Sequence, residues 1–262
     1  MSALFLRPDW PAPPSVFAAV STRRGGVSLP PWNSLNLGGH VGDDPAAVAE
    51  NRRRLGQALG LTRDPVWLTQ VHGTRVLTLD GGAPVDVVAD AVLTRTPGVP
   101  CVVMTADCLP VLFCDRAGTV VAASHAGWRG LAAGVLRGTV AAMGVAPGDI
   151  VAWLGPAIGP ACFEVGEEVR AAMLDNAVDA RHGAAIPACF TPSATQPGKL
   201  LADIYGLARA ELQALGVGAT YGGGFCTVTD SAHWYSYRRD GVTGRMAALV
   251  WLEEVGRLTL DA

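Results

Sequence analysis

The chain is poor in charged residues, and its positive charge comes almost entirely from arginine. Charged residues make up 16% of the 262 residues, the net charge is −3, and Lys199 is the single lysine. No basic run or stripe stands out, which argues against nucleic acid as the main partner. No apolar stretch reaches the roughly 18 residues of a membrane span, because Asp107 interrupts the best candidate. We therefore expect neither nucleic acid nor a membrane as a partner, and the pattern leaves protein partners open.

Several short motifs are also missing. No C-x-x-C pair occurs among the six cysteines, which excludes a zinc ribbon and a thioredoxin-like site. The chain has neither a Walker loop nor a G-x-G-x-x-G fingerprint, so nothing indicates a nucleotide-binding loop of those kinds. The N-terminus lacks the charged and apolar regions of a signal peptide. We therefore expect a cytoplasmic protein whose cysteines are buried, catalytic or metal-binding rather than disulfide-linked.

What is present is an apolar content of 50%, in a chain long enough for a large core. Helices and strands mix without strict β-α-β alternation, which favours an α+β fold with mixed, largely antiparallel sheets. We expect residues 1–262 to form a single domain. Two predicted helices begin at Asp44-Pro45 and after Gly130, and two more span 165–174 and 203–215. Besides a central hairpin, the predicted strands are 66–71, 75–79, 150–154, 233–237 and 246–252.

The hairpin carries the first chemical signal. Two Val-rich runs, 109–115 and 118–124, flank the turn residues Asp115-Arg116-Ala117-Gly118. If Arg116 and Ala117 form the loop, Cys108 and His125 face each other at the open end, where opposite Cβ atoms lie about 4.5–5.5 Å apart. That spacing suits two ligands of one metal ion or a thiol and its base, and a bulge would spoil it.

His72 ends another predicted strand at a glycine, as His125 nearly does. Two imidazoles and a thiolate suit zinc, and three protein ligands with a water form the catalytic arrangement. The plainer interpretation is two surface histidines and a buried apolar cysteine. Asp107 either orients the site or forms a turn, and turn chemistry explains it more simply.

Five further residues are candidates for binding a substrate or phosphate. Arg23 and Arg24 lie in a glycine-rich loop and could bind an anion bidentately, although most surface arginines are simply solvated. Arg129 lies at a predicted helix N-terminus, where backbone N–H groups also attract phosphate. The other two candidates are the carboxylates of Asp90 and Glu164.

These segments together resemble the YfiH-like family, also called laccase-domain polyphenol oxidases. Its members are also described as purine nucleoside phosphorylases and as the peptidoglycan editing factor. The resemblance runs in family order over nearly the whole chain, at residues 21–28, 34–55, 69–76, 105–115, 124–131, 155–166, 223–230 and 235–245. It implies a layered α/β sandwich, and it implies metal ligation by the His of Q-V-H-G, the Cys of A-D-C and the His of H-A-G-W-R-G. Here those residues are His72, Cys108 and His125.

The resemblance favours a zinc enzyme that acts on small-molecule substrates, a purine nucleoside and phosphate. It implies phosphorolysis of adenosine, guanosine, inosine and methylthioadenosine, with adenosine deamination as a second activity. An alternative is a hydrolase or amidase that edits peptidoglycan precursors, with Cys108 as nucleophile and His125 or His72 as base. A multicopper laccase needs more imidazoles than five histidines supply, although one copper ion could occupy the same three ligands. A binding protein with a structural zinc would need a closed, four-ligand site.

Overall fold

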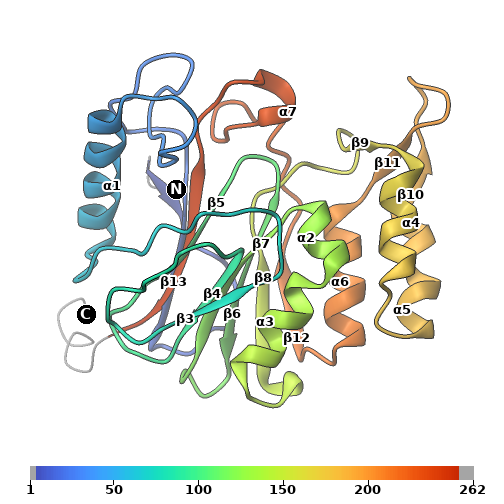
Figure 1. The fold of residues 1–262 in the computed structure, drawn as a ribbon, viewed down its shortest axis with the longest axis horizontal. Helices are drawn as coiled ribbons and strands as arrows, with labels where there is room; N and C mark the ends of the chain where they lie inside the picture. The colour runs from blue at the N-terminus through green and yellow to red at the C-terminus, as the bar shows by residue number, and fades with distance from the viewer. Residues whose placement is uncertain (1–3, 254–262) are drawn as a thin grey trace.

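The computed structural model describes residues 4–253, and its centre is two stacked β-sheets (Figure 1). The first sheet has the order β1 (Phe5–Leu6), β2 (Val16–Ser21), β13 (Met246–Leu252) and β5 (Cys101–Thr105). The second has the order β12 (Ala219–Gly222), β8 (Ile150–Leu154), β6 (Leu109–Asp115), β7 (Val121–Ala126), β4 (Ala91–Thr94) and β3 (Val76–Leu79). A small third sheet joins β10 (Phe190–Pro192), β11 (Leu200–Ala202) and β9 (Glu164–Val165).

Most strand pairs are antiparallel, and β12–β8 and β3–β4 are parallel. The predicted α+β class with mixed, largely antiparallel sheets is confirmed. The helices are α1 (Pro45–Leu59), α2 (Trp128–Ala133), α3 (Val135–Met143), α4 (Glu167–Asp175), α5 (Ala180–Ala185), α6 (Ile204–Ala214) and α7 (Tyr237–Asp240). Over residues 4–253, none of them has both the length and the apolar character to cross a bilayer.

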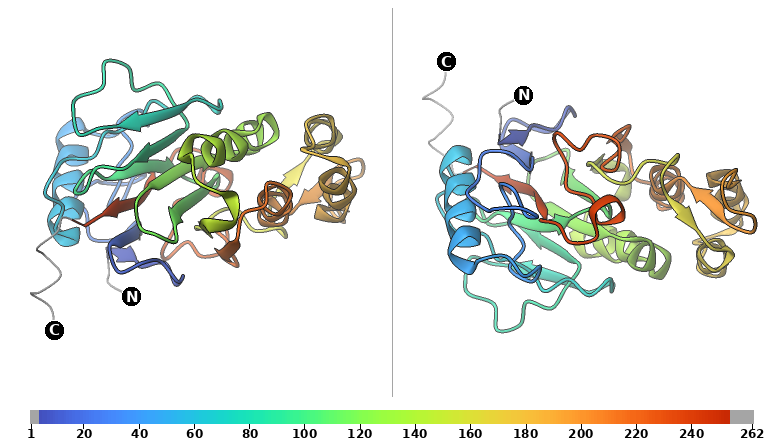
Figure 2. Two further views of the ribbon diagram at one scale, coloured as in Figure 1. Left: turned by 90° about the horizontal axis from the view of Figure 1, so that it is seen from below. Right: turned by 90° about the horizontal axis from the view of Figure 1, so that it is seen from above.

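The layers follow from apolar residues on both faces of the central strands. Along β13, Met246, Ala248 and Val250 pack in the core between the two sheets, whereas Ala247 and Leu249 pack in the core beneath α1. Alternate residues of a strand point to opposite faces, so a strand buried on both sides becomes continuously apolar. The far face of the six-stranded sheet is covered by α2, α3 and α6. Figure 2 shows α1 at one end of the molecule and α4 and α5 at the other.

One carboxylate is buried in this helical layer. Glu211 of α6 is 3% exposed, and its Oε1 has no hydrogen-bond partner. Burial raises the pKa of Glu211 to about 7, against the opposing effect of Arg137. The folded protein therefore holds a proton that the unfolded chain releases near pH 4.5. The contribution of Glu211 to the free energy of unfolding therefore falls as pH rises from about 4.5 to 7. Above pH 7 the total loss is about 3 kcal/mol.

We expect Glu211→Gln to remove this pH dependence, because the amide carries no charge at any pH. Urea unfolding at pH 5 and pH 8 measures the effect, with the exposed Glu167→Gln as the matched control. The difference in unfolding free energy between the two pH values should shrink by about 3 kcal/mol in Glu211→Gln and stay as in the wild type for Glu167→Gln. Equal pH profiles for all three proteins would contradict this assignment.

The predicted hairpin is present, but its predicted register is wrong. Leu109 pairs with Ala126 and Pro110 with His125, so Cys108 does not lie opposite His125. The loop is longer because the Asp115 carboxylate accepts hydrogen bonds from the Thr119 and Val120 backbone N–H groups, at 2.7 and 2.9 Å. The shift of two residues preserves the faces of the strands. Cys108 and His125 therefore still point to one side.

Three other elements differ from the prediction. Residues 66–71 form an isolated bridge at Thr69 rather than a strand, and 233–237 lead into α7 instead of forming one. The helix predicted after Gly130 divides at Gly134, whose φ of +96° interrupts the helical backbone. The helix predicted at Asp44-Pro45 is confirmed, with the Asp44 side chain accepting from the Ala46 N–H as N-cap.

Candidate metal centre

Three ligand-bearing side chains meet at one end of the sheet sandwich. His72 precedes β3, Cys108 lies in the link from β5 in one sheet to β6 in the other, and His125 lies near the end of β7. Cys108 Sγ is 3.7 Å from His72 Nε2, and the two imidazole rings are 4.8 Å apart, edge to face. One ligand atom from each residue lies within 4.8 Å of the other two. The group predicted from the sequence is therefore assembled by the fold.

Asp90, immediately before β4, positions both histidines. Its fully buried carboxylate lies 2.8 Å from His125 Nδ1 and accepts hydrogen bonds from the backbone N–H groups of Val71, His72 and Gly73. The first contact engages Nδ1 and leaves Nε2 of His125 to face Cys108, with which His125 also forms a side-chain hydrogen bond. The other contacts fix the turn that carries His72. A carboxylate behind a ligating imidazole is the usual outer support of a metal site.

The backbone is unusual at two points of this site. Among residues 4–253, His72 (φ +61°) and Asp107 (φ +86°) are the non-glycine residues in the left-handed region. Asp107 is held there by Thr227 Oγ1, which donates to Oδ1 at 2.5 Å, and by the Arg238 N–H, which donates to Oδ2 at 2.6 Å. The Asp107 carbonyl also accepts from Ile158. Asp107 is thus a structural residue that sets the direction of Cys108.

The charges in the group support one another. Burial opposes ionisation of the Cys108 thiol, but His125 and His72 beside it lower its pKa below the ordinary value. Burial likewise opposes a charge on His125, whereas the Cys108 thiolate and the Asp90 carboxylate raise its pKa. Burial also works against ionisation of Asp90, and hydrogen bonds from His125 and the backbone lower the pKa of its carboxyl. The thiolate is the form that binds metals and acts as a nucleophile.

The donor set and its spacing fit a tetrahedral metal ion. Zinc–sulfur and zinc–nitrogen bonds of about 2.3 and 2.0–2.1 Å separate two tetrahedral ligands by roughly 3.6 Å, close to the 3.7 Å between Cys108 and His72. Gly127 leaves room for these ligands: a Cβ there would lie 2.9 Å from Cys108 Sγ and 2.7 Å from His72 Cδ2. His72, Cys108 and His125 could therefore hold one ion.

The group lies in the wall of a cavity of about 500 Å³, within the range of small-molecule sites. The sequence pointed to only a few of the lining residues, because the others come from distant loops without a common pattern. The additional lining residues include His40, Gln70, Trp128, Phe163, Tyr237, Arg238 and Arg245. His40 lies within the 34–55 segment of the family resemblance, but the sequence does not mark it as a site residue.

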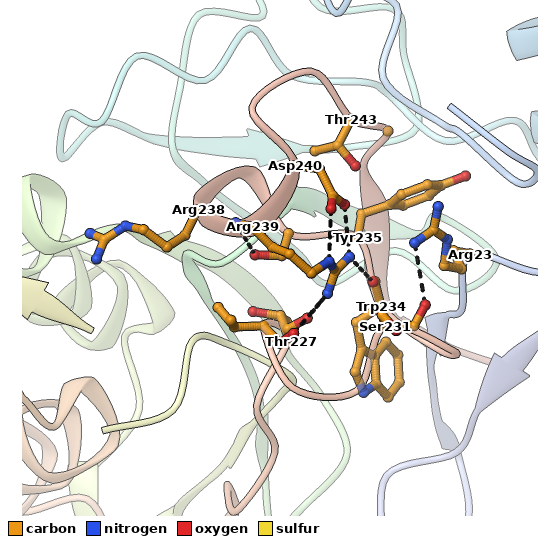
Figure 3. A network of polar contacts seen from close by, with 12 residues as sticks. Arg23, Thr227, Ser231, Trp234, Tyr235, Arg238, Arg239, Asp240 and Thr243 are labelled. Carbon is orange, nitrogen blue, oxygen red and sulfur yellow. Dashed lines mark hydrogen bonds and ion pairs between the residues drawn. The ribbon is translucent and has the colours of Figure 1, made fainter. Parts of the chain in front are cut away.

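The segment that carries Tyr237 and Arg238 is fastened by Arg239. The Arg239 guanidinium donates to the carbonyls of Thr227, Val228 and Trp234 and pairs with Asp240 (Figure 3). The Arg238 side chain points the other way, and its Nη1 donates to the carbonyls of Cys162 and Glu164. Arg239 therefore supports the cavity wall, whereas Arg238 lines it.

The structure separates the candidate substrate residues. Arg129 lines the cavity, with its guanidinium 4.4 Å from the Trp128 ring centre. Arg23 donates to the carbonyls of Asn33 and Ser231, and Arg24 to that of Ala232, outside the cavity wall. The Glu164 carboxylate accepts from Ser193, also outside it. Asp90 is buried behind His125 and has no surface for a substrate.

Comparison with known proteins shows the family of the chain. The family model described as multi-copper polyphenol oxidoreductase laccase matches residues 17–253. The chain is 57% identical over 250 residues to a purine nucleoside phosphorylase of Pseudomonas aeruginosa, covering 95% of this chain and 99% of that protein. It is 56% identical over 253 residues to purine nucleoside phosphorylase YfiH of Escherichia coli, covering 96% of this chain and 100% of that protein.

Solved structures share the fold. A Neisseria meningitidis protein superimposes with a TM-score of 0.86 at 52% identity, covering 95% of this chain and 99% of that one. YlmD from Geobacillus stearothermophilus superimposes with a TM-score of 0.86 at 33% identity, covering 97% and 98%. The resemblance inferred from the sequence motifs is confirmed by both comparisons.

Proposed function

We propose that this chain, which belongs to the family described as multi-copper polyphenol oxidoreductase laccase, is a zinc-dependent purine nucleoside phosphorylase. Relatives that are more than half identical to it are named purine nucleoside phosphorylases. The observation that carries the proposal is the His72–Cys108–His125 group in the wall of a cavity large enough for a nucleoside. Three side chains leave one tetrahedral position for a water or substrate, as in catalytic zinc sites.

Zinc fits this group better than a copper cluster does. Two imidazoles and a thiolate suit zinc, although copper binds the same ligands more tightly. A multicopper oxidase needs further ligands, yet the chain has five histidines, and within residues 4–253 this is the one group of three metal-ligating side chains. We therefore propose a single zinc ion, with copper as a competitor for the same position.

Phosphorolysis joins a phosphate oxygen to C1′ of the ribose while the C1′–N bond breaks and the purine leaves with its electron pair. Trp128, Phe163 and Tyr237 line the cavity, where their rings would pack against a purine, and Arg129 adds positive charge. A bound zinc ion would supply a Lewis acid and lower the pKa of a water to about 7. The proposed substrates are adenosine, guanosine, inosine and methylthioadenosine, and adenosine deamination is a second proposed activity.

The chain of side-chain contacts from Cys108 to His125 to Asp90 favours a second candidate function. A thiol, an imidazole and a carboxylate in sequence are the parts of a nucleophilic hydrolase, and Asp90 holds His125 as such a site requires. This hydrolase would act on peptidoglycan precursors. Added zinc distinguishes the two candidates. It would bind the Cys108 thiolate and so inhibit a hydrolase that uses this thiolate as nucleophile, whereas it would support the activity of the phosphorylase.

The proposal is tested by incubating zinc-loaded protein with adenosine and inosine, with and without phosphate, and measuring free base and ribose 1-phosphate. We expect base release that requires phosphate and that disappears when a chelator removes the metal. Absence of turnover of every nucleoside by the zinc-loaded protein would contradict the proposal, and muropeptide substrates would then test the hydrolase.

We also propose a cytoplasmic location. All six cysteines are unpaired thiols in the structure, as expected in a reducing compartment. Measurement of the enzyme in fractionated cells tests this location.

A further inference from the structure

The cavity carries more positive than negative charge. Arg129, Arg238 and Arg245 line it, together with the single carboxylate of Asp107. That carboxylate is already engaged by Thr227 and the Arg238 N–H. None of the seven ion pairs found in residues 4–253 includes Arg129, Arg238 or Arg245. A cavity with this balance of charge favours an anionic ligand.

Arg245 is the least exposed of the three arginines, since it is half-buried whereas Arg129 and Arg238 are exposed. Arg129 lies against Trp128, and Arg238 donates to the carbonyls of Cys162 and Glu164. Arg245 donates from Nη1 to the nearby carbonyls of Thr243 and Gly244, and burial lowers the pKa of its guanidinium. Arg245 is half-buried and forms no ion pair within residues 4–253, so the negative charge of a ligand would offset part of the free energy that desolvation of its guanidinium costs.

The fold holds Arg245 in place before any ligand arrives. The Arg245 N–H donates to Asn36 Oδ1 at 2.9 Å, and its side chain packs against Gly38, where a Cβ would come within 2.8 Å of Arg245 Cγ. The 35–40 segment, Leu-Asn-Leu-Gly-Gly-His, thus holds Arg245 in the cavity wall and does not contribute a metal ligand. Its asparagine and glycine fix the arginine, and its histidine joins the same wall.

His40 lines the cavity within the electrostatic reach of Arg245. Burial, Arg245 and Arg52 all lower the pKa of His40, which keeps its imidazole neutral. A neutral imidazole offers one N–H donor and one acceptor nitrogen, which matches a phosphate that carries both bare and protonated oxygens. Arg245 is also within electrostatic reach of Cys108, so this part of the wall adjoins the metal group.

We propose that Arg245, with His40 beside it, binds inorganic phosphate as the co-substrate in the cavity. The inference rests on the proposed phosphorylase activity and assigns the phosphate to a residue 137 positions beyond Cys108 in the chain. Since Nη1 donates to the carbonyls of Thr243 and Gly244, Nε and Nη2 would offer two parallel N–H groups to two phosphate oxygens, a geometry that lysine does not reproduce. The same group would recognise the 5′-phosphate of a nucleotide, so the test must distinguish the two sources.

The test compares the zinc-loaded wild type with Arg245→Gln, Arg245→Lys and Arg24→Gln. Arg24→Gln is the matched control, because it removes an arginine whose Nε binds a carbonyl away from the cavity. Arg245→Gln should raise the KM for phosphate roughly ten- to hundredfold, the usual effect of losing hydrogen bonds to a charged group. The KM for inosine and the zinc content should stay unchanged. Arg245→Lys should give an intermediate KM for phosphate, and Arg24→Gln the wild-type value.

Direct binding separates this inference from the proposed function. Titration calorimetry with inorganic phosphate, without a nucleoside, should show binding to the wild type and a matching loss in Arg245→Gln. If the wild type turns over nucleosides with phosphate and Arg245→Gln keeps the wild-type KM for phosphate, the assignment of Arg245 fails and the phosphorylase stands. If no nucleoside is turned over but phosphate binding depends on Arg245, the anion site stands and the phosphorylase fails. If Arg245→Gln binds adenosine 5′-monophosphate more weakly than the wild type does but binds inorganic phosphate equally well, the co-substrate assignment is overturned.

Arg245→Gln could lose phosphate through unfolding alone. Thermal unfolding of each variant detects this, and Arg245→Lys retains the packing against Gly38 and the positive charge. A folded Arg245→Lys protein with wild-type phosphate affinity would contradict the bidentate recognition on which the inference depends.

Discussion

Replacement of Cys108 by alanine should abolish metal binding and nucleoside turnover together. The thiolate is the one sulfur ligand in the group, and its loss leaves two imidazoles that meet across the cavity wall. We expect zinc content to fall from about one ion per chain, the three-ligand expectation, to a small fraction of that value. The rate of base release should fall by at least a factor of about a thousand, as when a reactive group is removed from other enzymes. Metal analysis and the phosphate-dependent assay measure both effects.

Cys114→Ala is the matched control. Cys114 lies on β6, close to Cys108 in the chain, but its side chain is buried between the two sheets, away from the cavity. Its loss should cost stability through the small space it leaves and change neither zinc content nor specific activity. Full activity with one zinc per chain in Cys108→Ala would show that Cys108 is neither ligand nor nucleophile.

Asp90→Asn should produce the second large effect, on metal affinity and stability together. The substituted amide would retain one oxygen acceptor, while its NH₂ group would face N–H donors that now bind the carboxylate. A buried donor without an acceptor costs about 1–3 kcal/mol, so we expect the unfolding free energy to fall by about 2–4 kcal/mol. Metal affinity should fall about 10–100-fold, because His125 loses the group that fixes its ring. Zinc titration against a chromophoric chelator and urea unfolding of the metal-free protein measure the two effects.

Asp115→Asn separates the two consequences. Asp115 is a buried carboxylate of the same sheet that accepts hydrogen bonds from Thr119 and Val120 in the hairpin loop. Its substitution should reduce stability by a similar amount and leave metal affinity unchanged. If Asp90→Asn and Asp115→Asn lower metal affinity equally, the effect of Asp90 is general destabilisation, and its positioning role is wrong.

The sequence predicts the regular elements better than their junctions. The two hairpin strands, α1 and β13 follow from local patterns: apolar runs, a cap and a proline. The hairpin register depends on one side chain, because the Asp115 carboxylate fixes a longer loop than the turn residues alone indicate. The break at Gly134 is similarly local, since an isolated glycine within a helical pattern is often tolerated.

Some residues of the candidate site can likewise be predicted from local motifs, whereas others are brought together only by the fold. His72, Cys108 and His125 could be named from short motifs, since each ligand lies beside distinctive residues. Asp90 could be named only as a polar group, because its contact with His125 joins residues 35 positions apart. Arg245 and His40 line the same cavity because loops from opposite ends of the chain pack together, and no periodic pattern connects them. The glycine-rich loop also predicts two anion-binding arginines, Arg23 and Arg24, and the fold places both outside the cavity wall.

The central claim is that His72, Cys108 and His125 hold one zinc ion with a position left open. X-ray absorption at the zinc edge of the loaded wild type tests it most directly. The account predicts one sulfur neighbour at about 2.3 Å, two imidazole nitrogens at about 2.0–2.1 Å and one further light atom that exchanges with added ligands. The sulfur signal should be absent from Cys108→Ala. A zinc ion without a sulfur neighbour, or one closed by four protein ligands, would contradict the account.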